Sequence, residues 1–217
     1  MLTRVLRGDP RKVSRFHDFA GNAAPLAAYA RLPTCIASTL IKKVAGRHPA
    51  GPWLGYRGIR RLADLLRPTW QVLEFGAGNS TRWLADRVAK VVSIEGDPAW
   101  YGRIAVAVAR RTNVNLILQP PPYDAAFAAS LAATFDFCLV DGLARDRAME
   151  LALSKVAPGG FVYLDNADVQ DDEHQRARRL LLARCEPASV EIFIDFFPGQ
   201  ITVSQGILGR VPRLGRG

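Results

Sequence analysis

The sequence predicts a single doubly wound α/β domain whose core is a mostly parallel sheet. The chain has 217 residues, of which 49% are hydrophobic, and this is enough for one sizeable core with extensions. From residue 70 onward, short β-rich apolar runs alternate with helical stretches, which is the rhythm of βαβ units. Two further β-rich runs near the carboxyl terminus lie too close together for a parallel crossover.

Five of the apolar runs are expected to form the parallel strands of an open sheet. They are Gln71–Phe75, Val91–Glu95, Val114–Leu118, Phe135–Val140 and Phe161–Leu164. The last two runs, Val190–Phe197 and Ile201–Leu208, are joined by only Pro198-Gly199-Gln200. A parallel crossover needs about a dozen residues or more, so this pair should form an antiparallel hairpin.

Helices are expected between the strands and ahead of the first strand. The clearest begins at Asp97, an N-cap residue that is followed by Pro98 at the first helical position. An amphipathic helix is expected over Tyr56–Leu66, and a later helix should end near Arg184. Residues 1–50 are expected to form two or three short helices that pack over the domain.

The net charge of +9 is concentrated at the two ends of the chain. Residues 1–50 carry nine Lys or Arg against two Asp, residues 210–217 carry three Arg, and residues 51–209 hold 17 basic and 18 acidic residues. The predicted organisation is therefore a basic helical N-terminal extension, a nearly neutral main domain and a basic tail. Such ends can rest on nucleic acid or on an anionic membrane, but a solvated chain end is the simpler interpretation and is favoured.

The cysteine pattern and the hydropathy favour a cytoplasmic protein. The three cysteines are odd in number and widely spaced, and no C-x-x-C occurs, so neither a disulfide framework nor a zinc site is indicated. The most apolar early stretch, residues 23–46, is interrupted by an arginine, a proline and two lysines, so it does not predict a transmembrane helix. Residues 10–15 are too polar for the apolar core of a secretory signal.

A glycine-rich loop, Gly76-Ala77-Gly78-Asn79-Ser80-Thr81, follows the first predicted strand directly. Its glycines allow a tight turn and a close approach of a ligand to the backbone. Asn79, Ser80 and Thr81 are good N-cap residues, so a helix should begin here with free backbone donors that face the loop.

Two acidic residues lie beside this loop in the predicted sheet. Glu74 is near the end of the first strand, where a buried carboxylate needs a partner such as a ligand's ammonium group. Glu95 ends the second strand, where an acid can accept hydrogen bonds from a ribose diol. Glu74 could equally be an exposed strand-end acid, the N-cap residues plain caps, and Glu95 a turn former. All these features fall on the sheet edge where open α/β folds bind ligands, and this coincidence favours a binding site.

Four segments carry a resemblance to a known family. They are Val72–Thr81, Val92–Tyr101, Leu139–Gly142 and Pro158–Asn166. The first two resemble the first two motifs of class I S-adenosylmethionine-dependent methyltransferases, and the other two resemble the motifs of that family's fourth and fifth strands. The predicted hairpin resembles the antiparallel seventh strand of the same fold. The resemblance implies a Rossmann-like methyltransferase fold with seven strands in the order 3-2-1-4-5-7-6.

The resemblance also implies which residues bind the cofactor. Glu74 and the glycine-rich loop would hold the methionine moiety of S-adenosylmethionine, and Glu95 would hold its ribose hydroxyls. Trp100 and residues near Gln119 would flank the adenine. Ser80 departs from the family pattern, since many members have a third glycine there. The expected cofactor-binding residues are Glu74, Gly76, Ala77, Gly78, Asn79, Ser80, Thr81, Glu95, Gly96, Trp100 and Asp141.

A dinucleotide is the competing cofactor, because NAD(P)-dependent oxidoreductases also combine a strand, a glycine-rich turn and a later acid. Their motif places a third glycine three residues after Gly78, where this chain has Thr81. The carboxylate of Glu74 would also lie unfavourably close to a pyrophosphate. An oxidoreductase is therefore the remote alternative.

Asp141, which ends the fourth predicted strand, is the expected catalytic residue. Methyl transfer from a sulfonium is an in-line displacement, so the protein mainly has to align the nucleophile and remove its proton. The alternative role of Asp141 is that of a turn acid before Gly142. The sequence favours O-methylation of a small molecule or a sugar, and the alternatives are an RNA-associated methyltransferase and a non-catalytic module that binds S-adenosylmethionine.

Asp141, Asp165 and Asn166 also form a candidate metal site. They place three hard oxygen ligands on adjacent strand ends, which suits Mg²⁺. The arrangement is similar to that of metal-dependent catechol and caffeoyl-coenzyme A O-methyltransferases. An Asp-Asn pair is also ordinary at a strand end, and this interpretation is the more frequent one.

Aromatic residues are candidates for the walls of the site. Trp53 and Tyr56 lie ahead of the first strand, where they either line the mouth of the site or pack in the core. Phe196 and Phe197, at the tip of the hairpin, have the same two interpretations.

Overall fold

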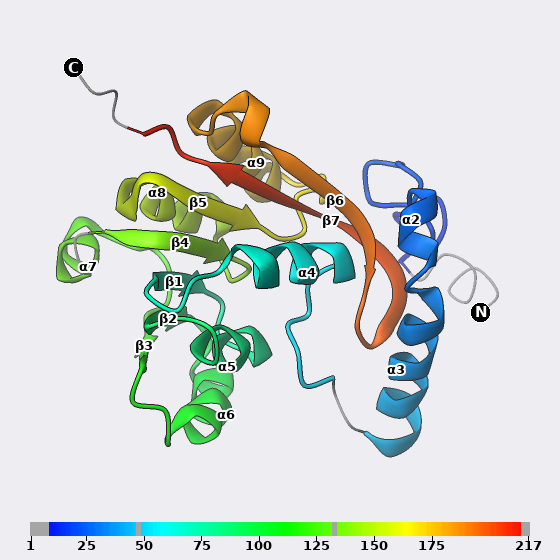
Figure 1. Ribbon diagram of the computed structural model, residues 1–217, viewed down its shortest axis with the longest axis horizontal. Coiled ribbons are helices and arrows are strands. Elements are labelled where there is room, and N and C mark those ends of the chain that lie inside the picture. The colour runs from blue at the N-terminus through cyan, green and yellow to red at the C-terminus, as the bar shows by residue number, and fades with distance from the viewer. Residues whose placement is uncertain (1–8, 47–48, 132–133, 214–217) are drawn as a thin grey trace.

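The structure is a computed structural model that describes residues 9–46, 49–131 and 134–213 (Figure 1). In chain order, the elements are α2 (Leu26–Tyr29), α3 (Leu32–Ala45), α4 (Tyr56–Leu65), β1 (Gln71–Phe75), α5 (Asn79–Ala85), β2 (Lys90–Glu95), α6 (Pro98–Val108), β3 (Val114–Leu118), α7 (Ala125–Ser130), β4 (Phe135–Val140), α8 (Arg145–Lys155), β5 (Val156–Leu164), α9 (Asp172–Arg184), the 3₁₀ turn η1 (Pro187–Ser189), β6 (Glu191–Phe197) and β7 (Gln200–Arg210).

The strands form one sheet in the order β3-β2-β1-β4-β5-β7-β6. Strands β1 to β5 are parallel, whereas β7 runs antiparallel to both β5 and β6. The predicted α/β class, strand order and antiparallel hairpin are therefore confirmed. Since β1 lies between β2 and β4, the chain reverses its direction of winding there, and this point of an open sheet is where ligands bind.

Both faces of the sheet are covered by helices, as alternation along β1 requires. Leu73 and Phe75 belong to a buried cluster with residues of α8 and α9, while Val72 belongs to a second cluster with residues of α4 and α5. Successive side chains of a strand point to opposite faces, so β1, which is buried from Val72 to Phe75, has a core on each side. The acid of this strand, Glu74, is fully buried as well.

The expected bounds of strand β5 differ from the structure, whereas the expected start of α6 does not. Strand β5 begins at Val156 and not at Phe161, because Val156 already pairs with Phe135 of β4 before a register shift. The segment Pro158-Gly159-Gly160 therefore lies inside this irregular strand and does not form a separate turn before it. The expected helix start is confirmed, since the side chain of Asp97 accepts a hydrogen bond from the backbone nitrogen of Trp100 at 2.7 Å.

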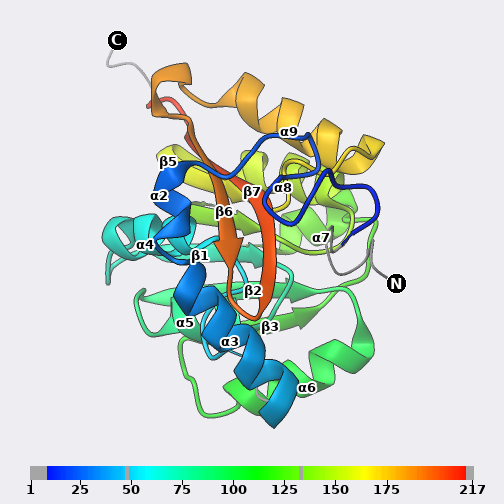
Figure 2. The ribbon, with the colours of Figure 1, turned by 90° about the vertical axis from the view of Figure 1, so that its right-hand side faces the viewer.

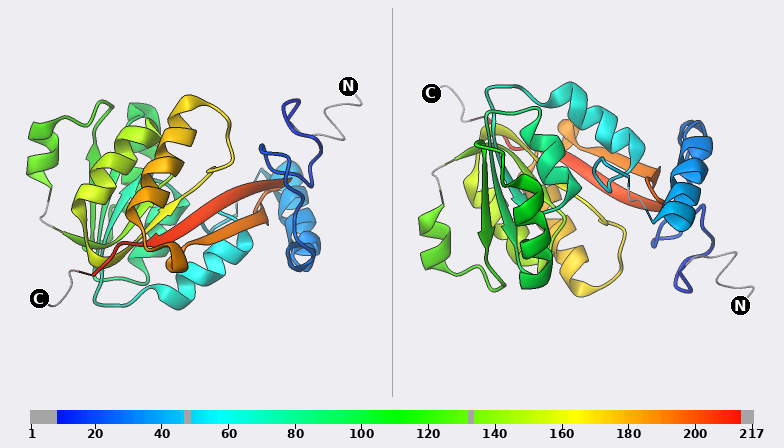
Figure 3. Two further views of the ribbon diagram at one scale, coloured as in Figure 1. Left: turned by 90° about the horizontal axis from the view of Figure 1, so that it is seen from above. Right: turned by 90° about the horizontal axis from the view of Figure 1, so that it is seen from below.

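Helices α2 and α3 pack against the far end of the β6–β7 hairpin, which projects beyond the other strands (Figure 2, Figure 3). Ala28 of α2 and Cys35 of α3 are buried there against Phe196 and Val203. The expected short N-terminal helices are thus present, but they cover the hairpin and not the whole domain. Residues 1–8 lie outside the described residues, and the proposed domain bounds stay a prediction. No described helix combines the length and the apolar character needed to cross a bilayer.

Candidate active site

A cavity of about 350 Å³ lies at the carboxyl edge of the sheet, where the loops after β1, β2 and β4 meet. A volume of this size is at the lower end of the range found for small-molecule sites. Its lining consists of Trp53, Gly76, Ala77, Gly78, Asn79, Ser80, Glu95, Trp100, Asp141, Gly142, Leu143 and Arg145. The structure therefore brings most of the predicted site residues together. Glu74 and Thr81 are buried and do not belong to this lining, and neither does Gly96.

The two glycines of the loop have different structural roles. Gly76 has φ of +96°, and a Cβ there would lie 2.7 Å from the carbonyl carbon of Asp141 and from the Cα of Gly142. At Gly78 a Cβ would meet only the Oγ of Ser80 within 4 Å, at 3.7 Å. Gly76 is thus required by the backbone, while Gly78 leaves space on the cavity side.

This difference predicts that two matched substitutions have effects of different size on stability. Gly76→Ala is expected to lower the free energy of unfolding by about 3 kcal/mol, through backbone strain and overlap with the β4 loop. Gly78→Ala is expected to change it by less than about 1 kcal/mol. Urea unfolding of both variants measures the difference, and equal losses would contradict the assignment of the two glycines.

Glu74 contacts the glycine-rich loop through Thr81. Its Oε2 accepts hydrogen bonds from the hydroxyls of Thr81 and Ser93, each at 2.6 Å, and the Oγ1 of Thr81 accepts one from the backbone nitrogen of Gly78 at 2.9 Å. Among the described residues, the buried Oε1 has no hydrogen-bond partner. Burial raises the pKa of Glu74 to about 7, against the opposing effect of its hydroxyl donors. The expected contact of Glu74 with a ligand's ammonium group stays a prediction.

Glu95 joins the loops that follow β1 and β2. Its Oε2 accepts a hydrogen bond from the backbone nitrogen of Ala77 at 3.1 Å, and its Oε1 accepts one from the backbone nitrogen of Asp97 at 2.8 Å. The indole nitrogen of Trp100 donates to the carbonyl oxygen of Ala77 at 2.7 Å. The carboxylate and the indole are therefore both held in place at the cavity wall. A carboxylate oxygen can accept more than one hydrogen bond, so Glu95 retains capacity for a diol.

Two residues ahead of α4, Pro49 and Trp53, lie at one side of the cavity. The amide of Asn79 donates to the carbonyl oxygen of Pro49 at 2.9 Å, and Trp53 belongs to the cavity lining. Of the two aromatic residues ahead of the first strand, Trp53 lines the mouth of the cavity, whereas Tyr56 packs against the buried cluster at the hairpin. Phe196 is fully buried in that cluster, so it is a core residue.

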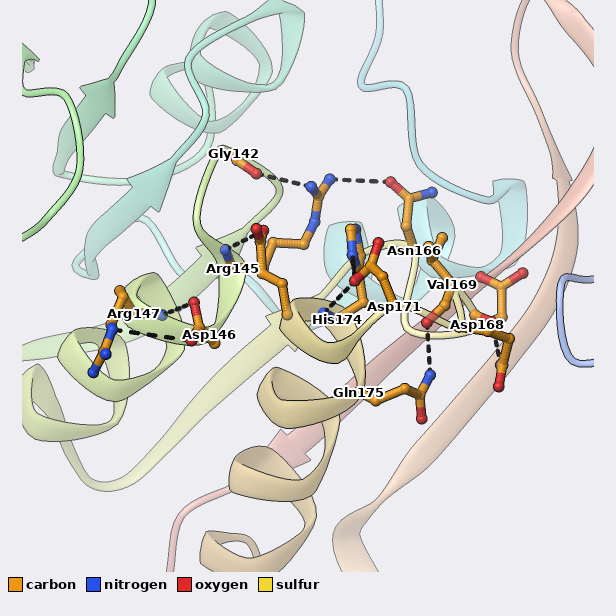
Figure 4. A network of polar contacts seen from close by, with 12 residues as sticks. Gly142, Arg145, Asp146, Arg147, Asn166, Asp168, Val169, Asp171, His174 and Gln175 are labelled. Carbon is orange, nitrogen blue, oxygen red and sulfur yellow. Dashed lines mark hydrogen bonds and ion pairs between the residues drawn. The ribbon is translucent and has the colours of Figure 1, made fainter.

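Asp141 is held by an arginine that the sequence pattern did not single out. The Nη2 of Arg145 donates to Asp141 Oδ1 at 2.9 Å. The same Nη2 donates to Asn166 Oδ1 at 3.1 Å, and Nη1 donates to the carbonyl oxygen of Gly142 at 2.8 Å (Figure 4). Burial raises the pKa of Asp141, and the guanidinium opposes this effect. The available signal was a cation four residues after Asp141, at the start of the next helix.

The structure does not support the predicted Mg²⁺ site at Asp141, Asp165 and Asn166. In the part of the chain that the structure describes, no group of three or more His, Cys, Asp or Glu is arranged to hold a metal ion. Arg145 binds the oxygens of both Asp141 and Asn166, so a fixed guanidinium supplies the positive charge between these two strand ends. Asp165 is 5% exposed, and burial together with the charge of Asp141 raises its pKa well above the usual range.

A second cavity of about 310 Å³ lies on the other side of Asn166. Its lining consists of Asp9, Lys12, Arg15, Phe19, Asn166, Phe197, Gln200, Thr202 and Ser204. Asn166 contacts the linings of both cavities. Its side-chain oxygen accepts a hydrogen bond from Arg145, and its side-chain nitrogen donates one to the hydroxyl of Ser204 at 2.9 Å. Lys12 is 4% exposed and donates to Thr202 Oγ1 at 3.2 Å and to the carbonyl oxygen of Val203. No sequence motif marks this cavity, because its lining joins segments about 190 residues apart in the chain.

Comparison with known proteins finds no family model and no curated protein that matches the chain. Solved structures do match. The O-methyltransferase from Bacillus cereus, in complex with SAH, has a TM-score of 0.58 and 21% identity over 82% of this chain and 90% of its own. The O-methyltransferase TomG from Streptomyces achromogenes, involved in tomaymycin synthesis and in complex with SAM, has a TM-score of 0.57 and 22% identity over 82% and 89%. The chain has a methyltransferase fold.

The methyltransferase fold does not by itself specify an acceptor. An rRNA methylase from Streptococcus thermophilus also matches, with a TM-score of 0.54 and 16% identity over 70% of this chain and 92% of its own. Structures named for small-molecule synthesis and for rRNA thus share this architecture. The acceptor has to be inferred from the cavities of this chain.

Proposed function

We propose that this protein is an S-adenosylmethionine-dependent methyltransferase that methylates an oxygen of a small molecule. The observation that carries the proposal is the cavity at the carboxyl edge of β1, β2 and β4, in which a glycine loop, the carboxylate of Glu95 and the indole of Trp100 converge. The three cysteines are free and buried, which fits a reducing compartment, and a cytoplasmic location is part of the proposal.

The residues of the cavity fit this cofactor. The space beside Gly78 would admit the methionine portion, Glu95 would accept hydrogen bonds from the ribose hydroxyls, and Trp100 would pack against the adenine. Among the described residues, the buried Oε1 of Glu74 has no hydrogen-bond partner, and behind the loop it would attract an ammonium group of the cofactor. When bound, the cofactor supplies an electrophilic methyl group on a sulfonium.

Asp141 takes the proton of the acceptor hydroxyl at its carboxylate. It lines the first cavity and is adjacent, through Arg145, to Asn166 of the second cavity. The acceptor occupies this second cavity, so that its hydroxyl reaches past Asn166 toward Asp141. The raised pKa makes Asp141 a stronger base than an exposed aspartate. Arg145 positions the carboxylate and contributes a fixed positive charge.

The size and lining of the second cavity favour a small acceptor over RNA. A cavity of about 310 Å³ with Asn166, Gln200, Thr202 and Ser204 suits a hydroxylated small molecule or a sugar unit. Base recognition of single-stranded RNA uses exposed aromatic platforms interleaved with basic residues. The aromatic residues of this cavity, Phe19 and Phe197, are half-buried in its lining and do not form such a platform.

Calorimetric titration of S-adenosylmethionine tests the cofactor assignment. The protein is expected to bind S-adenosylmethionine with a Kd in the micromolar range and to show no binding of NADH. Glu95→Ala should weaken binding about 10- to 100-fold, since it removes charge-assisted hydrogen bonds to the ribose. Gly78→Ala should weaken it as well, because the added methyl group fills space on the cavity side.

Asp86→Ala is the matched control, because Asp86 is a surface acid whose side chain is 56% exposed and is paired with Arg111. It should leave the affinity unchanged. Absence of binding to the unmodified protein would overturn the assignment, and a preference for NADH would indicate an oxidoreductase. Transfer of a labelled methyl group to a pool of hydroxylated small molecules then tests for turnover and distinguishes an enzyme from a binding module.

A further inference from the structure

Helix α3 exposes an apolar face to solvent. Ile36, Leu40 and Val44 follow one another at intervals of four residues, with exposed fractions of 39%, 55% and 86%, and Ile41 beside them is 53% exposed. Residues spaced by four lie on the same face of a helix. A helix at the surface of a globular protein usually presents polar residues to water, so α3 has the reverse pattern.

Polar contacts on the opposite face fix this orientation. The Sγ of Cys35 donates to the carbonyl oxygen of Gln200 at 3.1 Å, and the backbone nitrogen of Gly199 donates to the hydroxyl of Ser38 at 3.0 Å. These contacts hold α3 on the tip of the β6–β7 hairpin. The apolar face therefore cannot turn inward without breaking them, and it needs a partner outside the domain.

The surroundings of this face are cationic. Arg15, Lys42 and Lys43 line a hollow of about 570 Å³ between α3 and the hairpin, and no acidic side chain of the described residues belongs to its lining. The sequence from residue 19 to residue 63 contains seven Lys or Arg and no Asp or Glu. A partner that covers α3 must therefore combine apolar material with negative charge.

The dimensions favour a lipid surface over a second copy of the chain. The 14 residues of α3 span about 21 Å, and a stripe of that length and about 10 Å width covers roughly 200 Å². A stable protein interface buries about 800 Å² on each partner. Two copies that met through this face would also bring their lysines together. An amphipathic helix with flanking lysines can instead lie in the interfacial plane of an anionic bilayer.

We propose that α3 docks the protein on an anionic phospholipid surface. Ile36, Leu40 and Val44 enter the boundary between headgroups and acyl chains, and Lys42 and Lys43 contact the phosphate groups. The protein does not span the bilayer in this arrangement. The proposal does not rest on the proposed methyl transfer, because these residues of α3 line neither of the two cavities assigned to it.

Co-sedimentation of the full chain with vesicles tests the proposal. Binding is expected to vesicles that contain phosphatidylglycerol, and at least tenfold weaker binding to vesicles of phosphatidylcholine alone. Val44→Glu should weaken binding to the anionic vesicles about tenfold or more. Val106→Glu is the matched control, because Val106 of α6 is 81% exposed but lies on another helix, and it should bind as the unmodified protein does. Lys43→Gln should lower binding and its dependence on salt.

Soluble inorganic phosphate at millimolar concentration is expected not to displace the protein from the vesicles. Equal binding to both kinds of vesicle, or equal effects of the two valine substitutions, would overturn the proposal. Light scattering during size-exclusion chromatography provides a second readout. A dimer that Val44→Glu dissociates would show that a second copy covers this face, and the lipid proposal would then be wrong.

Discussion

Asp141→Asn is expected to lower kcat about 10²- to 10⁴-fold, which is the usual contribution of a positioned general base. The amide of Asn cannot take a proton from the acceptor hydroxyl, but its oxygen can still accept the hydrogen bond from Arg145. The affinity for S-adenosylmethionine should therefore stay within about tenfold of the original. Turnover with a responsive acceptor and calorimetric titration of the cofactor give the two values.

The same assignment predicts the pH dependence. Burial raises the pKa of Asp141, so the carboxyl is protonated at a higher pH than an exposed aspartic acid. A protonated carboxyl cannot act as a base, and kcat/KM should fall as the pH decreases through this raised pKa. The acidic limb should therefore lie above the usual range near 4 and disappear from the residual activity of Asp141→Asn.

Asp165→Asn is the matched control for this prediction. Asp165 is also a buried acid at a strand end, but it does not belong to the cavity lining. The variant should keep kcat within about tenfold of the original, and it should not lower stability, because it removes a carboxyl whose ionisation is disfavoured by burial. Equal losses in Asp141→Asn and Asp165→Asn would show that Asp141 has no special role as a base.

Local sequence patterns were sufficient for most of the sheet and for the glycine-rich loop. The strand Phe135–Val140 is apolar at every position except Asp136 because both of its faces are buried, and this pattern is readable without tertiary information. The parallel direction of these strands places their carboxyl ends at one edge. The residues that follow β1, β2 and β4 therefore had to meet, as the shared cavity shows.

Contacts between distant segments were not predictable in this way. Glu74 looked like a carboxylate in need of a ligand, but hydroxyls from a neighbouring helix and strand already bind one of its oxygens. Lys12 contacts Thr202, and α3 rests on Gly199 and Gln200, through pairings that no local spacing encodes. The predicted metal site stays without support, and three oxygen-bearing residues at strand ends do not reveal a guanidinium that comes from the next helix.

Arg145→Met is expected to lower kcat/KM about 10- to 100-fold, because it removes charge-assisted hydrogen bonds to Asp141 and Asn166. The guanidinium opposes the effect of burial on Asp141, so its loss should raise the pKa of Asp141 further. The acidic limb of the pH profile should then move to higher pH. Arg145→Lys keeps the charge but not the planar fork, and it should give an intermediate result in both measurements.

Arg147→Met is the control, because Arg147 lies two residues further on α8, is 52% exposed and pairs only with Asp146 and Glu150 among the described acids. Surface pairs of this kind contribute little, so activity and pH profile should not change. The unmodified protein should keep its activity in EDTA, since Arg145 supplies the positive charge between the strand ends. A pH limb that does not move in Arg145→Met would show that the guanidinium does not act through Asp141, and a loss of activity in EDTA would show that a bound metal ion takes part.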